Sequence, residues 1–213
     1  MTTPSEQMID LLAGQPVVPV LLVRRLEDAI PLARALARGG LPAIEVTLRT
    51  PVALDAIRLV SQEVPEAIVG AGTILSARDY GRAADAGSRF IVSPGTTPQL
   101  LAEARLGGLP FLPGAATPSE IMALQEEGYP AAKFFPAEQA GGAPYLRALA
   151  SPLAQMRFCP TGGITPKNAE SYLSLPNVIC IGGSWVAPDA LVGDGRWDEI
   201  EALAREASKL RRK

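Results

Sequence analysis

The sequence predicts an α/β protein with a (β/α)8 (TIM) barrel fold and an extra N-terminal helix. Aliphatic or β-branched runs recur eight times, 20 to 26 residues apart, and each interval holds a helical pattern. The length of 213 residues suits a compact barrel. A doubly wound sheet is the alternative, but eight evenly spaced units favour the barrel. Because no linker or low-complexity tract interrupts the pattern, we expect residues 1–213 to form a single domain.

An amphipathic helix at about residues 5–13 opens the chain, and the predicted strands follow. They comprise residues 17–23, 43–47, 68–70, 90–92, 110–112, 131–134, 156–159 and 178–181. After the first strand, Leu26, Ala29, Ile30, Ala33 and Ala37 have the three-and-four spacing of a buried helical stripe. The last helix runs from 197 to about 210, with acidic residues first and basic residues last, as the helix dipole favours.

Four Thr-Pro pairs mark predicted helix starts, because threonine caps the first amides and proline fits the first helical position. These pairs are residues 50–51, 97–98, 117–118 and 165–166. The spacings of Thr117 with Glu120 and of Ser76 with Asp79 add capping-box signals.

Composition excludes several classes of function. The net charge of −2 gives no case for a nucleic acid or an anionic membrane as partner. No apolar run approaches the roughly 18 residues that span a bilayer, and the first residues lack the order of a signal peptide, so we expect a cytoplasmic protein. The chain has no histidine, which removes Ser-His-Asp and Cys-His catalysis and argues against a zinc site. Cys159 and Cys180 lie in apolar segments and are interpreted as buried thiols.

Lys133 stands out because it lies in the apolar strand 131–134 of a chain with only four lysines. Desolvation penalises an ammonium there and favours the neutral amine, which is a nucleophile toward carbonyls and can form a Schiff base. An arginine could not do this. A lysine at a strand end whose amine reaches water is the alternative interpretation.

The strand 43–47 carries the second candidate group. Alternation places Glu45, Thr47 and Arg49 on one face, and an inward carboxylate needs a partner. Lys133, four strands away around the ring, could point into the same interior. Glu45 is then a proton shuttle beside a Schiff-base lysine and Arg49 an anion clamp. A structural Glu45–Lys133 ion pair and a surface Glu45–Arg49 pair are the alternatives.

Two strands near the end of the chain are followed by paired glycines and a hydroxyl. Thr161, Gly162 and Gly163 follow one strand, and residues 182–184 follow the next. Such loops expose backbone amides, and the loops after the seventh and eighth strands are the usual phosphate site of this fold. Tight turns also use paired glycines, and plain turns are therefore the alternative interpretation.

Six motifs together closely resemble the 2-keto-3-deoxy-6-phosphogluconate (KDPG) aldolase / 4-hydroxy-2-oxoglutarate aldolase family of class I pyruvate aldolases. The resemblance covers about residues 16–208, and the motifs are residues 45–49, 69–73, 93–95, 133–138, 157–163 and 180–185. It implies a lyase of the Entner–Doudoroff route that cleaves KDPG to pyruvate and D-glyceraldehyde 3-phosphate. The family is metal-independent, uses no cofactor and is typically homotrimeric.

The resemblance also implies residue roles. Lys133 would form the Schiff base and Glu45 would move protons. The residues expected to bind substrate are Arg49, Thr73 and Pro94 around the pyruvyl carboxylate, Phe135 beside the lysine, and Thr161, Gly162, Gly163, Gly183 and Ser184 around the phosphate. The chain departs mildly from the family pattern at Gln139, Thr96 and residues 115–116, which bear on the pocket wall and on which aldehydes it accepts.

Several other activities compete with this interpretation. An aldolase for 4-hydroxy-2-oxoglutarate would keep Lys133 and Glu45 without needing a phosphate site. An aldolase for the galactonate epimer would differ around the phosphate loops, where Thr161 with Ser184 favours the gluconate form. A phosphosugar isomerase or epimerase barrel would want a carboxylate pair or a histidine, and a non-catalytic phosphate-binding barrel would not need Glu45 and Lys133.

Overall fold

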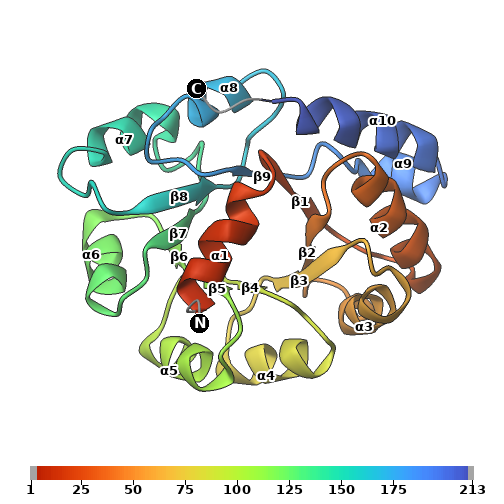
Figure 1. The fold of residues 1–213 in the computed structure, drawn as a ribbon, viewed down its shortest axis with the longest axis horizontal. Helices are drawn as coiled ribbons and strands as arrows, with labels where there is room; N and C mark the ends of the chain where they lie inside the picture. The colour runs from red at the N-terminus through yellow and green to blue at the C-terminus, as the bar shows by residue number, and fades with distance from the viewer. Residues whose placement is uncertain (1–3, 211–213) are drawn as a thin grey trace.

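The computed structural model describes residues 4–210, in which parallel strands alternate with helices (Figure 1). The strands are β1 (Val17–Leu21), β2 (Ala43–Thr47), β3 (Ile68–Gly72), β4 (Ile91–Val92), β5 (Phe111–Leu112), β6 (Gly114–Ala115), β7 (Ala131–Phe134), β8 (Arg157–Pro160) and β9 (Ile181–Gly183). The helices are α1 (Pro4–Ala13), α2 (Ala29–Arg38), α3 (Ala53–Glu63), α4 (Ala77–Asp85), α5 (Pro98–Gly107), α6 (Pro118–Glu126), α7 (Gly142–Leu149), α8 (Ala169–Leu173), α9 (Asp189–Gly193) and α10 (Trp197–Ser208), with a 3₁₀ turn at Leu26–Asp28.

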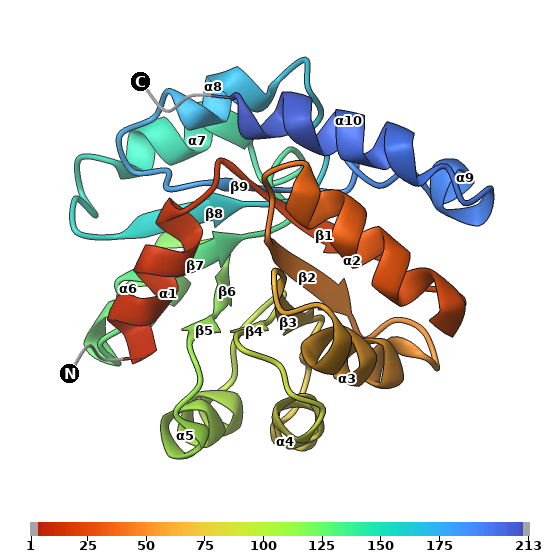
Figure 2. The ribbon, with the colours of Figure 1, turned by 45° about the vertical axis from the view of Figure 1, so that its right-hand side comes forward.

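The strands form a curled parallel sheet in two parts. One part has the order β5-β4-β3-β2-β1-β9, and the other has the order β6-β7-β8. Only Pro113 separates β5 from β6, and single bridges join Phe158 to Val178 and Thr161 to Gly182. Helices α2 to α10 lie around the outside of the strands (Figures 1 and 2). The predicted α/β class with parallel strands is therefore confirmed.

Two apolar layers lie on the two faces of this sheet. The larger one packs the outward side chains, such as Ile44 and Phe134, against the surrounding helices. The smaller one lies inside the curl and joins Ala43 and Ala131 to Met8 and Leu12 of α1. Helix α1 thus covers the end of the curl where the strands begin (Figure 1).

Small residues on β3 make the interior possible. A Cβ at Gly70 would lie 2.5 Å from ring carbons of Phe90, whose side chain is fully buried. Real atoms do not approach so closely, so position 70 must be glycine for Phe90 to fill the interior. The glycines of the β3 motif are therefore needed for packing between neighbouring strands.

Several predicted helix starts match the structure and two do not. Thr97 and Thr117 accept hydrogen bonds from Leu100 N and Glu120 N, and Ser76 caps α4 in the same way. The predictions at Thr50 and Thr165 are wrong, because α3 begins at Ala53 and α8 at Ala169. The Thr50 hydroxyl instead donates to Val23 O at 2.6 Å. The Thr165 amide donates to Asn168 Oδ1 at 2.7 Å, so Thr165 stands in a turn before the helix.

Two strands also differ from prediction. The segment after Pro113 pairs with β7 as β6, and β9 runs from Ile181 to Gly183, which pairs with Pro19, so it begins and ends later than the predicted 178–181. Both glycine-rich parts were predicted as loop because glycine lowers strand propensity; the parallel neighbours override that preference. No helix within residues 4–210 is long and apolar enough to cross a membrane.

Candidate active site

Lys133 and Glu45 meet inside the curled sheet. Lys133 Nζ donates to Glu45 Oε1 at 3.0 Å, and its distance to Oε2 is 3.4 Å. The two side chains are only 7% and 4% exposed. Because side chains alternate along a strand, Glu45 shares the inward face with Ala43, and Lys133 shares it with Ala131. The pair therefore lies directly above the interior apolar layer.

Gly72 leaves the space that the Glu45 carboxylate occupies. A Cβ at position 72 would lie 2.0 Å from Glu45 Oε1, an impossible contact. Glu45 pairs with Gly70 in the β2–β3 register, so its side chain passes over the next inward position of β3. The glycine at 72 is thus a structural condition for the Glu45–Lys133 contact.

The inward face of β2 continues from Glu45 to Thr47 and Arg49. The Thr47 hydroxyl donates to Leu21 O at 2.8 Å and accepts from Arg49 Nε at 3.0 Å. Arg49 is exposed, and it lies against Thr47 instead of Glu45. The surface Glu45–Arg49 pair considered from the sequence is therefore absent, and the charged end of Arg49 is held at the exit of the strand, where an anion can reach it.

One aromatic ring, that of Phe135, lies beside the Lys133 amine. Lys133 Nζ lies 5.7 Å from the centre of the Phe135 ring, within range of a cation–π contact. Phe134 points the other way and stacks on Tyr145 at 5.6 Å. Of the two phenylalanines that follow the lysine, Phe135 is the one beside the amine.

The loop after Lys133 is tied to the loop after β8. Ala137 N donates to Thr161 O at 2.8 Å, and Glu138 N donates to Gly162 O at 3.1 Å. Gly162 and Gly163 have φ angles of 107° and 76°, which favour glycine. The two glycines therefore let the Thr161–Gly163 segment turn beside Lys133.

The side chain of Tyr172 holds the loop that follows Lys133 through a hydrogen bond. Tyr172 of α8 donates a hydrogen bond to Glu138 Oε1. Burial raises the pKa of Tyr172, and the contact with Glu138 raises that pKa further. Sequence reasoning missed this pair, since the two residues lie 34 positions apart with no shared motif. The pair fixes the segment that connects Lys133 to the glycine loop.

The expected phosphate residues gather at the ends of β8 and β9. Thr161 is buried and bridges to Gly182, and Ser184 is exposed just beyond β9. Gly183 is buried within β9, where a Cβ would lie 2.0 Å from the Trp185 ring. The sequence placed Gly183 in a loop; its strand position is a correction, and its glycine is required by Trp185.

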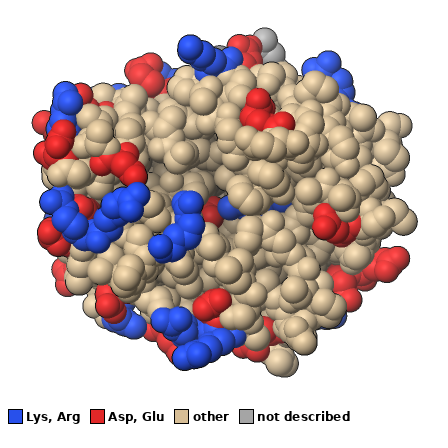
Figure 3. Space-filling view, turned by 180° about the vertical axis from the view of Figure 1, so that it is seen from behind, with Lys and Arg blue, Asp and Glu red and all other residues tan. Residues whose placement is uncertain are grey.

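Thr73 and Pro94 follow neighbouring strands on the same side. Thr73 has a φ of 60°, unusual for a β-branched residue, and such strain is often found at functional sites. Pro94 packs on β6, because a Cβ at Gly114 would lie 2.3 Å from the Pro94 carbonyl carbon. On the face opposite α1, charged atoms of both signs lie recessed near the centre (Figure 3).

Comparisons with known proteins identify the family of this chain. The family described as KDPG and KHG aldolase matches residues 8–203. The chain belongs to the KDPG and KHG aldolase family. It is 51% identical to the KHG/KDPG aldolase of Escherichia coli K12 over 197 residues, and this alignment covers 92% of each chain.

Solved structures of KDPG aldolases are also close to this chain. The enzyme of Legionella pneumophila, with pyruvate captured as a covalent carbinolamine, has a TM-score of 0.93 and 44% identity, covering 98% of this chain and 99% of that one. The Zymomonas mobilis ZM4 enzyme with 3-phosphoglycerate has a TM-score of 0.92 and 46% identity, covering 98% of each. The resemblance stated from the motifs is thus confirmed at the level of the family.

Removing one member of the Lys133–Glu45 pair should destabilise the fold. Lys133→Met or Glu45→Gln leaves a buried partner without its counter-charge, and we expect each to lower the free energy of unfolding by about 3–5 kcal/mol. In the double variant the loss of unfolding free energy should be smaller than the sum of the losses in the two single variants. Urea unfolding of the four proteins gives the coupling energy.

The matched control is the Arg24–Asp189 pair, whose side chains are 63% and 61% exposed at an N–O distance of 2.9 Å. The same cycle there should give about 0–1 kcal/mol. A coupling for Lys133 and Glu45 no larger than that of the control would contradict the buried ion pair.

Proposed function

We propose that this protein is a class I aldolase that cleaves KDPG to pyruvate and D-glyceraldehyde 3-phosphate through a Schiff base on Lys133. The observation that carries the proposal is the buried contact of Lys133 Nζ with Glu45, at 3.0 Å, in a member of an aldolase family. An amine and a carboxylate in contact, away from bulk water, supply the nucleophile and the proton carrier that this reaction needs.

Glu45 first takes a proton from the Lys133 ammonium, which frees the nitrogen lone pair. The amine then adds to the C2 ketone of the substrate, and the new C–N bond gives a carbinolamine. Protonation of its hydroxyl lets water leave and produces an iminium ion. The Legionella relative, in which pyruvate was captured as a carbinolamine, supports the same covalent chemistry here.

Cleavage uses the iminium as an electron sink. A base removes the proton of the C4 hydroxyl, the C4–O bond becomes a carbonyl, and the C3–C4 bond breaks. The electron pair of that bond moves to C3 and neutralises the iminium as an enamine, while glyceraldehyde 3-phosphate leaves. Glu45 lies nearest to the reacting nitrogen. We therefore assign to it both the removal of the C4 hydroxyl proton and the later delivery of a proton to C3. Water then hydrolyses the iminium to pyruvate and the free amine.

Substrate binding is assigned to two groups of residues. Arg49, Thr73 and Pro94 lie at the ends of β2, β3 and β4 and would line the pocket for the pyruvyl carboxylate, which Arg49 pairs with, while Phe135 lies beside the amine. Thr161, Gly162, Gly163, Gly183 and Ser184 would hold the phosphate. The Zymomonas relative with 3-phosphoglycerate supports a phosphorylated ligand, because that molecule has the carbon chain length and the phosphate of the aldehyde product.

Cleavage of 4-hydroxy-2-oxoglutarate is the second candidate. The Escherichia coli relative is named for both KHG and KDPG, and the Lys133–Glu45 chemistry needs only the keto acid. The gluconate epimer is favoured over the galactonate one by Thr161 with Ser184. An isomerase or epimerase would need other acid–base groups than a lysine–carboxylate pair.

Assignments of architecture and assembly accompany the function. The two sheet parts are proposed to form one closed (β/α)8 barrel with α1 as an added helix, supported by the bridges at Thr161 and Phe158. One domain is supported by a core that includes residues from Val17 to Ala207. A homotrimer is proposed from the family resemblance alone and a cytoplasmic location from the composition; sedimentation velocity tests the first and cell fractionation the second.

Trapping with borohydride tests the Schiff base. In the presence of pyruvate, reduction should give one pyruvyl adduct by intact mass, with peptide mapping locating it at Lys133. Lys133→Arg should give no adduct and no aldol cleavage in an assay that couples pyruvate release to lactate dehydrogenase. The matched control is Lys167→Arg, which changes an exposed lysine and should behave like the wild type. An unchanged mass in the wild type would overturn the proposal.

Ser184 tests the phosphate assignment separately. Because its side chain is exposed at the end of β9, Ser184→Leu should fold normally but fill part of the phosphate site. We expect kcat/KM for KDPG to fall at least about tenfold, the value of one lost charge-assisted hydrogen bond, with little change for 4-hydroxy-2-oxoglutarate. Equal losses on both substrates would remove Ser184 from the phosphate site.

A further inference from the structure

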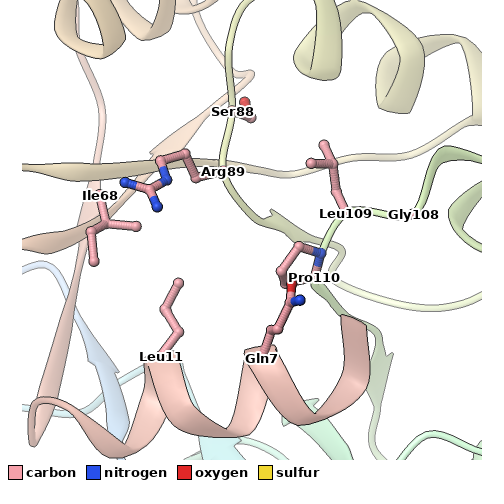
Figure 4. A pocket seen from close by; sticks show the side chains of 8 residues that line it. All are labelled: Gln7, Leu11, Ile68, Ser88, Arg89, Gly108, Leu109 and Pro110. Atoms are coloured by element: carbon pink, nitrogen blue, oxygen red, sulfur yellow. The ribbon is translucent and has the colours of Figure 1, made fainter. Parts of the chain in front are cut away.

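A pocket of about 480 Å³ lies between helix α1 and the end of the sheet where the strands begin. Gln7 and Leu11 line it from α1, Ile68 from the start of β3, and residues 88–89 and 108–110 from the segments before β4 and β5 (Figure 4). Its volume is in the range of small-molecule sites. The Glu45–Lys133 pair lies above the interior layer that α1 closes, so this pocket is distinct from the candidate active site.

Arg89 brings a positive charge to this pocket. Its side chain makes no ion pair or hydrogen bond with any residue between 4 and 210. Some other surface arginines are paired, as Arg25 is with Asp28 and Arg38 with Glu201. In Figure 4 the Arg89 guanidinium lies beside Ile68 and faces the hollow in front of Leu11. A guanidinium in this position is a ready site for a planar carboxylate.

The rest of the lining sets the class of ligand. Leu11, Ile68, Leu109 and Pro110 give apolar walls, which favour a hydrocarbon body. Ser88 lines the pocket too, but its hydroxyl is buried and lies apart from the Arg89 guanidinium and Leu11 (Figure 4), so Arg89 supplies the polar contact.

We propose that this pocket is a second ligand site, which binds small monocarboxylates with an apolar body. The carboxylate pairs with Arg89, and the hydrocarbon contacts Leu11 and Ile68. A phosphate ester fits less well, because one guanidinium and apolar walls cannot satisfy a dianion. The inference does not depend on the aldolase reaction.

Hexanoate is the probe for this site, with hexanamide as its neutral counterpart. Isothermal titration of the full-length protein should give saturable hexanoate binding with a Kd on the order of 1 mM, as expected for so few atoms. Hexanamide should bind at least about tenfold more weakly, because it lacks the charge-assisted hydrogen bonds. Hexanoate should also raise the Tm, since it binds the folded state.

Three arginine variants locate the binding. Arg89→Gln should weaken hexanoate at least about tenfold and leave aldol cleavage unchanged. Arg78→Gln, at an exposed position near the start of α4, is the matched control and should bind like the wild type. Arg49→Gln should also bind hexanoate normally, which separates this pocket from the candidate active site. Leu11→Trp, which fills the hollow, should abolish binding.

The absence of saturable hexanoate binding would overturn the proposal. Equal affinity in Arg89→Gln and the wild type would overturn it as well. Loss of binding in Arg49→Gln with retention in Arg89→Gln would assign hexanoate to the other site and would also refute it. Because Arg89 is exposed, its replacement should not disturb folding, so the test stands even where Leu11→Trp is unstable.

Discussion

A carboxylate and an amine buried in contact, Glu45 and Lys133, are the constraint on which the rest of the structure depends. Each alone would cost several kcal/mol to remove from water, and neither is more than 7% exposed. The contact therefore has to be kept in place by the backbone. It joins β2 to β7, which lie in different parts of the curled sheet, so the curvature of the whole sheet sets the distance between them.

The surrounding residues leave room for this pair and exclude water from it. Gly72 leaves room for the Glu45 carboxylate, and Gly70 lets Phe90 fill the layer below it. Helix α1 closes that layer with Met8 and Leu12. A Schiff-base reaction needs reacting groups that stay in place while the substrate binds. The apolar layer below holds Lys133 and Glu45 in position, and the polar strand ends above them are where substrate arrives. The Tyr172–Glu138 contact gives the same support to the loop beyond Lys133.

The sequence predicted features that depend on local spacing. Strand alternation was enough to place Glu45 and Lys133 on inward faces, and the hydroxyl-to-amide caps at Thr97 and Thr117 follow from three-residue spacing. Features that depend on neighbours across the sheet were not predictable in this way. The Gly72 requirement appears only when β2 and β3 are in register, and Gly183 became part of a strand because β1 pairs with it. The threonine at 165 carries the same motif as that at 117, but its hydroxyl donates to the Asn168 side chain instead of accepting from a backbone amide, and the helix starts later.

Deuterium exchange into pyruvate tests the central claim, that Glu45 moves protons for a Schiff base on Lys133, most directly. The methyl signal of pyruvate in D2O is followed by proton NMR with the wild type and with Glu45→Gln. The wild type should exchange the methyl protons, and Glu45→Gln should still form the reducible adduct while exchanging at least about 100-fold more slowly. Exchange at the wild-type rate in Glu45→Gln would contradict the account.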